Sequence, residues 1–174
     1  MTTRRDILRT ISIGMVAIAG LGLAACAGTP GSVDISGTEA RPVDRGYALR
    51  SVNSLRAQNG LPALSYSSRL DEASTRQARA MAARNTMSHT LEGKVSDRVT
   101  QYGYSWGAVA ENIGYGYPDT RSAVAGWENS PGHRKNILNP RVTEMGFAMA
   151  QGPNGIPYWA MIFGTEAKRM LVAR

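Results

Sequence analysis

Apolar residues recur with helical spacing in two stretches of the first half of the chain. Between residues 44 and 59 they lie three and four positions apart, and the Gly60 that follows favours a helix end. A second helix is predicted from the Ser67-Ser68 pair, which suits an N-cap, to about Asn85. Its predicted buried stripe is Leu70, Ala73, Gln77 and Met81.

The second half of the chain combines short helices with an alternating pattern. A short turn is predicted through Val99, and Asp119 is placed to cap a further helix. Large apolar residues alternate with glycine and alanine over 145–150, which is a strand period, and 158–163 is a second apolar strand. The GPNG turn between them predicts a hairpin. This order of elements predicts an α+β fold with helices packed on an antiparallel sheet.

The first 25 residues have the pattern of an export signal. Three arginines precede an apolar stretch from Ile11 to Ala25, which is shorter than the roughly 20 residues that span a bilayer. The segment TRRDILR (3–9) resembles a twin-arginine signal, and LAAC (23–26) resembles a lipobox. We therefore predict a cleaved signal peptide over 1–25 and a lipid on Cys26.

The lipid would anchor the protein to a membrane at the cell envelope. Residues 26–43 then comprise the lipidated cysteine and a Gly-, Pro- and Ser-rich flexible tether, 44–166 the folded domain and 167–174 a C-terminal tail. An alanine follows Cys26 instead of an aspartate. We therefore expect the outer membrane, facing the periplasm, if the host is Gram-negative.

Charge and cysteine content narrow the choice of partners. The chain carries a formal charge of +7, and removal of the signal, with three arginines and one aspartate, leaves +5. A basic surface suits anionic lipid, anionic wall polymer or nucleic acid, and export argues against nucleic acid. The single cysteine excludes an intrachain disulfide and a cysteine-rich zinc site. The length of 174 residues suits one domain, which we expect to be monomeric.

Five stretches surround or follow the two histidines of the chain. They are NSLRAQNGL (53–61), MSHT (87–90), AENIGYG (110–116), WENSPGHRKNIL (127–138) and NPRVTEMG (139–146). Together they resemble the CAP superfamily of cysteine-rich secretory, antigen 5 and pathogenesis-related 1 proteins, and above all its small bacterial branch. The resemblance covers about residues 44–165. It implies a three-layer α-β-α sandwich with a central antiparallel sheet and a cleft where histidines and acidic residues meet.

The resemblance also assigns site residues. His89 and His133 match the two family histidines, and Glu111 matches the glutamate of the AENI-type motif. Animal and plant members carry a second glutamate a few residues after the helix tryptophan, whereas Glu128 directly follows Trp127 here. One helical residue turns a side chain by about 100°, so the place of Glu128 in the site is doubtful.

The chemistry of these side chains leaves two interpretations open. Imidazole and carboxylate suit a divalent metal such as zinc, so His89, His133 and Glu111 are candidate metal ligands and candidate catalytic residues. The same three residues could equally form a structural network that satisfies buried polar groups.

Three functions remain open from the sequence. We favour a ligand-binding module for a lipid, a cell-wall fragment or a protein, because the sequence offers no clear nucleophile. The second is a metal-assisted hydrolase of peptide or wall bonds with Glu111 as general base. The third is a structural envelope protein, and resemblance in fold alone does not choose between them.

Overall fold

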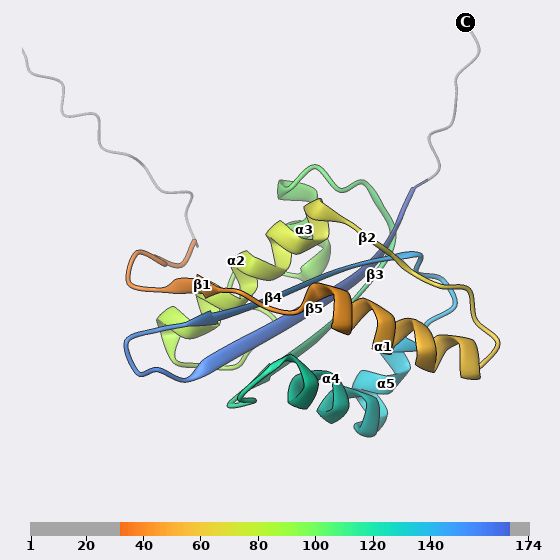
Figure 1. The fold of residues 1–174 in the computed structure, drawn as a ribbon. Helices are drawn as coiled ribbons and strands as arrows, with labels where there is room; N and C mark the ends of the chain where they lie inside the picture. Colours follow the sequence, from red (N-terminus) through yellow and green to blue (C-terminus); the bar gives the residue numbers. More distant parts are fainter. Residues whose placement is uncertain (1–31, 168–174) are drawn as a thin grey trace, which may run out of the picture. The chain divides into compact units, whose positions relative to one another are not determined.

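The computed structural model describes residues 32–167 (Figure 1). The predicted signal, Cys26 and the tail from residue 168 onward lie outside the described residues. Within residues 32–167, no helix combines the length and apolar character needed to cross a bilayer. The helices are α1 (Arg45–Gln58), α2 (Ser68–Arg84), α3 (Val95–Gln101), α4 (Thr120–Asn129) and α5 (Pro131–Ile137). The strands are β1 (Glu39–Arg41), β2 (Ser65–Tyr66), β3 (Trp106–Tyr115), β4 (Glu144–Gln151) and β5 (Pro157–Glu166).

The helices α1 and α2 are the two predicted in the first half of the chain. The Asp44 carboxylate caps α1 by accepting a 2.7 Å hydrogen bond from the backbone N–H of Tyr47. Asn85 ends α2 in the left-handed conformation, with φ of 47°. The predicted stripe of α2 is confirmed, since its four members, Leu70, Ala73, Gln77 and Met81, are all buried.

The sheet is built on the predicted hairpin of β4 and β5, which is confirmed. These strands pair antiparallel with Phe147 opposite Met161. The order across the sheet is β1-β4-β5-β3 with antiparallel neighbours, and β2 pairs in parallel with the start of β4. The strand β3 follows no simple alternation in sequence and was not predicted, although it forms one edge of the sheet.

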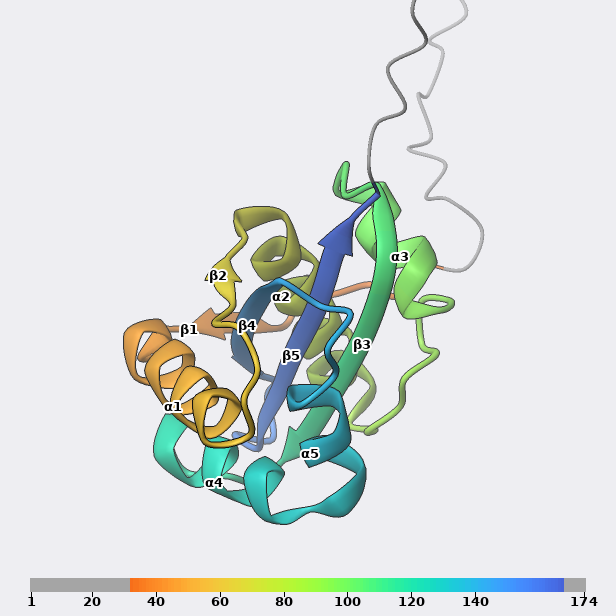
Figure 2. The ribbon, with the colours of Figure 1, turned by 90° about the vertical axis from the view of Figure 1, so that its right-hand side faces the viewer.

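Helices cover both faces of this sheet (Figure 2). On one face α1, α4 and α5 pack around Phe147, Met161 and their neighbours. On the other face α2 packs against Ala160 and its neighbours, and α2 and α3 together enclose Ile162. The predicted three-layer α-β-α sandwich is therefore confirmed.

Two close contacts fix how the helices pack around the sheet. The strand β4 touches the start of α2 at Gly146, where a Cβ atom would lie 2.2 Å from backbone atoms of Leu70 and Asp71. On the opposite face the guanidinium of Arg56, 1% exposed, joins α1 to the chain around α5. It donates hydrogen bonds to four backbone carbonyls, those of Pro62, Ile137, Asn139 and Val142. Four carbonyl acceptors offset part of the cost of burying this cation.

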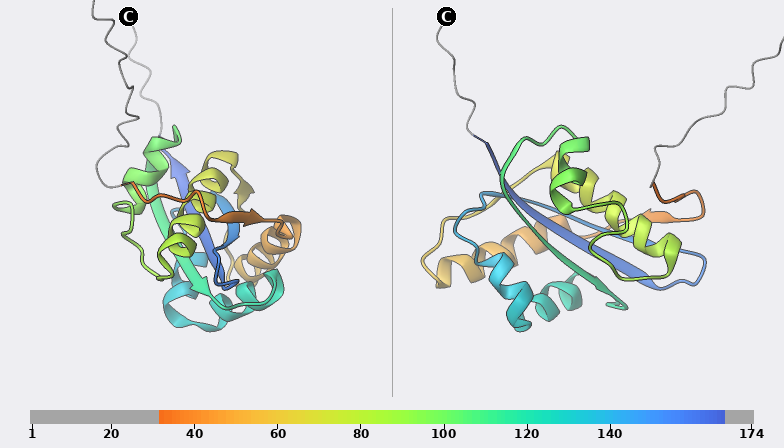
Figure 3. Two further views of the ribbon diagram at one scale, coloured as in Figure 1. Left: turned by 90° about the vertical axis from the view of Figure 1, so that its left-hand side faces the viewer. Right: turned by 180° about the vertical axis from the view of Figure 1, so that it is seen from behind.

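The segment 33–41, which we predicted to be flexible tether, packs on the domain. Val33 is 5% exposed, and its N–H donates to Glu92 over 2.9 Å. Arg76 and Arg79 of α2 donate to backbone carbonyls of the segment, which then pairs with β4 as β1 (Figure 3). The packed domain thus begins near residue 33 and not at 44. Many of these contacts are made by backbone carbonyls, which every residue has. The glycine- and serine-rich composition of the segment therefore could not predict them.

Candidate functional site

The buried carboxylate of Glu111 lies at the centre of the predicted site. Glu111 is on β3 opposite Ile162, two residues before Ile113, which packs against α2. Because alternate strand residues share a face, the Glu111 side chain points into the layer of α2 and α3. It is 3% exposed, and a carboxylate so deeply buried needs charged or hydrogen-bonding partners.

His89 supplies the first partner from the loop that follows α2. Its Nδ1 lies 2.7 Å from Oε2 of Glu111, while 57% of the side chain stays exposed. The buried Gln77 holds the loop by donating to the carbonyl of Ser88 over 2.6 Å. The hydrogen bond to Glu111 raises the pKa of His89 above its ordinary value, although burial opposes it.

Arg98 supplies the second partner, and our sequence reasoning missed it. It comes from α3, is 1% exposed, and pairs with Oε1 of Glu111. Its Nη1 also donates to the carbonyls of His89 (2.8 Å) and Gly93 (2.9 Å). One side chain therefore fixes both the carboxylate and the backbone that carries the imidazole. The ion pair with Arg98 makes the Glu111 carboxylate an acceptor, so we infer that His89 Nδ1 donates to Oε2 and that Nε2 is left for the solvent side.

His133 comes from α5, in the layer on the opposite face of the sheet. Its carbonyl accepts from Asn112 over 3.1 Å, and its ring lies 6.2 Å from the Trp127 ring, measured between centroids. Burial lowers the pKa of His133, and the charge of a protonated His89 lowers it further. Its Nδ1 is buried without a hydrogen-bond partner among the described residues. The two imidazoles thus approach the edge of β3 from opposite layers.

Glu128, the doubtful second acid, contacts a different part of the fold. Its Oε1 accepts from the Ser51 hydroxyl of α1 over 2.9 Å. Trp127 is fully buried in the core between α4 and the sheet, and the next residue along the helix turns toward α1. Glu128 therefore serves the contact between α1 and α4, and the structure does not bring it to His89 and Glu111.

The long motif that contains His133 also protects the open edge of β3. Trp127 Nε1 donates to the Ile113 carbonyl (3.2 Å) and Asn136 Nδ2 to the Glu111 carbonyl (3.0 Å). An unpaired strand edge invites pairing with another chain, and these side chains occupy its acceptors. The Asn136 bond also fixes the backbone of Glu111 itself.

Comparison with known proteins identifies this architecture. The family described as "CAP: Cysteine-rich secretory protein family" matches residues 49–163. The chain belongs to the CAP family. Two curated relatives come from Bacillus subtilis. "Uncharacterized membrane protein YlbC" is 34% identical over 100 residues, and "Uncharacterized protein YkwD" is 33% identical over 96. These alignments cover 56% and 54% of this chain but only 29% and 37% of the relatives.

Solved CAP structures support the same assignment. An extracellular protein of Bacillus anthracis that contains an SCP domain is 25% identical, with a TM-score of 0.62 over 70% of this chain and 40% of that chain. An outer surface protein of Borrelia burgdorferi has the higher TM-score, 0.67, over 74% of this chain and 98% of that one. Its identity is 20%, so it shows the shared fold alone.

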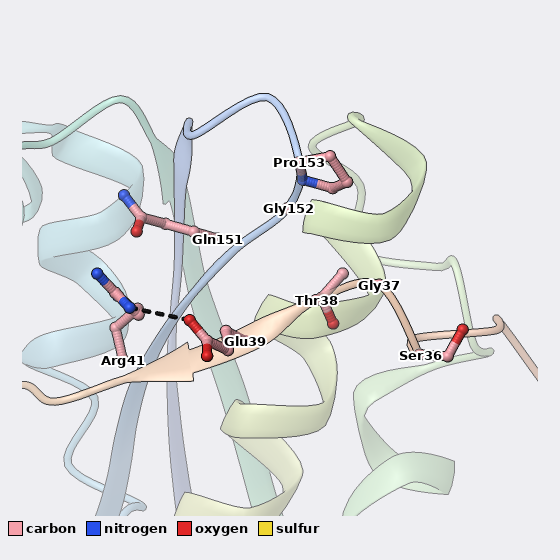
Figure 4. Close-up of a pocket in the computed structure, with 8 residues that line it drawn as sticks. All are labelled: Ser36, Gly37, Thr38, Glu39, Arg41, Gln151, Gly152 and Pro153. Carbon is pink, nitrogen blue, oxygen red and sulfur yellow. Dashed lines mark hydrogen bonds and ion pairs between the residues drawn. The ribbon is translucent and has the colours of Figure 1, made fainter.

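The CAP domain has an open pocket beside the His89–Glu111 pair. Its volume is about 270 Å³, and it is lined by His89, Thr90, Lys94, Val95 and Glu111. A larger hollow of about 500 Å³ lies between β1 and the turn that joins β4 to β5 (Figure 4). Its charged side chains, Glu39 and Arg41, pair with each other at 2.9 Å. Of the predicted site residues, His89 and Glu111 thus line the smaller pocket, whereas His133 and Glu128 do not.

The predicted metal set of His89, Glu111 and His133 stays a prediction, and the contacts of Glu111 bear on it. Both oxygens of Glu111 are engaged, one by Arg98 and the other by His89. Within residues 32–167, no three histidine, cysteine, aspartate or glutamate side chains are grouped to hold a metal ion. The Glu111 carboxylate contacts Nδ1 of His89, as the outer-shell partners of metal-binding histidines do.

Proposed function

We propose that this chain is an extracytoplasmic lipoprotein whose CAP domain binds a ligand in the pocket beside His89. Cys26 carries the lipid after removal of residues 1–25, and the domain is held at the envelope. The names of similar proteins support an envelope location, since they include a membrane protein, an extracellular protein and an outer surface protein.

The observation that carries the binding function is the fixed imidazole of His89. Its Nδ1 contacts Glu111, which forms a buried ion pair with Arg98. More than half of the His89 side chain is exposed, and it lines a pocket. Fixed polar groups at the wall of a hollow are typical of ligand sites. Hydrolysis with Glu111 as general base is less well supported, because both oxygens of Glu111 already have partners.

Ligand capture tests the binding function. The mature protein is incubated with envelope lipid extract and with wall fragments, and retained species are identified by mass spectrometry. We expect His89→Ala to reduce retention about tenfold, while Ser51→Ala, in the opposite layer, keeps it. Equal retention by the wild type and His89→Ala would contradict the proposal.

Membrane fractionation tests the anchor separately. We expect Cys26→Ser to move the protein from the membrane fraction to the soluble fraction and to remove the mass of the lipid. An unchanged distribution together with an unchanged mass would show that Cys26 is not the anchor.

A further inference from the structure

The pocket beside His89 carries an excess of positive charge. Its lining contains one carboxylate, Glu111, and that charge is balanced by the buried guanidinium of Arg98. The remaining charged or chargeable groups of the lining are the ammonium of Lys94 and the imidazole of His89. The sign of the pocket is therefore set by Lys94 and, when its ring is protonated, by His89.

These groups are available to a ligand. Because His89 Nδ1 contacts Glu111, its Nε2 remains for the pocket, where it carries a hydrogen and can donate when the ring is protonated. The Thr90 hydroxyl belongs to the lining of the same pocket. The described part of the chain gives Lys94 no ion-pair partner. Glu92, the next acid along the loop, is held by Arg76 and by the N–H of Val33.

We propose that this pocket binds an anionic group, a phosphate or a carboxylate, through the protonated ring of His89, the ammonium of Lys94 and the hydroxyl of Thr90, and that Arg98 gives it this preference over a metal cation. The inference rests on the proposed binding function and specifies the class of ligand. Charge-assisted hydrogen bonds to anionic oxygens are stronger than neutral ones. Without Arg98, an unpaired carboxylate would stand beside an imidazole, which is a donor set that a divalent cation prefers.

The first test uses two probes that separate free from lipid-borne phosphate. The mature chain with Cys26→Ser is titrated with inorganic phosphate, and separately with phosphatidylcholine vesicles with and without phosphatidylglycerol, while NMR follows the His89 ring and the Lys94 amide. We expect phosphate to shift both signals. If an anionic lipid headgroup also reaches the pocket, vesicles with phosphatidylglycerol should shift the same signals, and vesicles of phosphatidylcholine alone should not.

Matched lysine variants distinguish a site from general attraction. Lys94→Glu should weaken phosphate binding about tenfold or more, whereas Lys135→Glu, an exposed lysine on α5 with the same change in net charge, should alter it less than about twofold. Equal weakening by both variants, or no shift at the pocket in the wild type, would overturn the proposal. If the capture experiment then found an uncharged ligand that depends on His89, the proposed binding function would hold, and only the preference for an anionic ligand would be wrong.

The role of Arg98 has its own test. We expect Arg98→Met to lose phosphate binding and to gain affinity for Zn²⁺, measured by calorimetry, and Arg98→Met with Glu111→Gln to lose that gain. In the wild type, Glu111→Gln should leave Zn²⁺ affinity within about twofold. The role of Arg98 would be contradicted if the wild type bound Zn²⁺ tightly and Glu111→Gln weakened that binding about tenfold. This comparison does not need the Arg98→Met variant, so it holds even if that variant fails to fold.

Discussion

Replacing Glu111 by glutamine tests the ion pair on which the site is built. The substitution keeps the shape of the side chain but leaves the guanidinium of Arg98, 1% exposed, without its counter-charge. Removing one partner of a buried pair costs about 3–5 kcal/mol of folding free energy. The exposed pair of Glu39 and Arg41 is the matched control, and Glu39→Gln should cost less than about 1 kcal/mol.

The cost of Glu111→Gln should also depend on pH through His89. Glu111 raises the pKa of His89 above 6.5, so the stability gained from their contact is complete below that pH and is lost as the pH rises through the folded-state pKa. The free energy of unfolding, measured in urea, should therefore differ more between wild type and variant at about pH 6 than at about pH 9. A penalty below about 1 kcal/mol at both values would refute the reasoning.

Three further substitutions probe other parts of the account. Arg56→Met removes the donor to four carbonyls and should lower the unfolding free energy by about 2–4 kcal/mol in urea titrations. Gly146→Ala adds a Cβ atom where the α2 backbone lies, and should cost about 1–3 kcal/mol, seen as a lower midpoint in thermal unfolding. Burial lowers the pKa of His133, so protonation below pH 6.5 destabilises the fold; His133→Phe should reduce the loss of stability between about pH 7 and pH 5. A stability unchanged by Arg56→Met or Gly146→Ala, or the same acid sensitivity in His133→Phe, would count against the corresponding contact.

The parts of the fold with regular patterning were predictable. The stripe of α2 and the alternation in β4 each present apolar residues to a sheet or a helix layer, and periodicity reports that directly. The strand β3 escaped prediction because two of its buried positions hold polar residues, Glu111 and Asn112. Their partners lie elsewhere in the chain, so local patterning gives no sign that they are buried.

The site was predictable only in its residue types. The resemblance selected His89, Glu111 and His133, but only coordinates reveal that Glu111 contacts His89 directly while His133 lies in the opposite layer. Arg98 had no sequence signal, because an arginine in a short helix is usually solvated. Its pairing with Glu111 occupies one carboxylate oxygen, while the other oxygen contacts His89.

The tautomer of His89 is the most direct test of this arrangement. Long-range proton–nitrogen NMR correlations on the neutral ring report which nitrogen carries the hydrogen. We predict hydrogen on Nδ1, facing Glu111, with Nε2 unprotonated toward the pocket, and loss of this preference in Glu111→Gln. Hydrogen on Nε2 in the wild type, unaffected by Glu111→Gln, would contradict the claim that the ion pair of Arg98 and Glu111 presents this imidazole to a ligand.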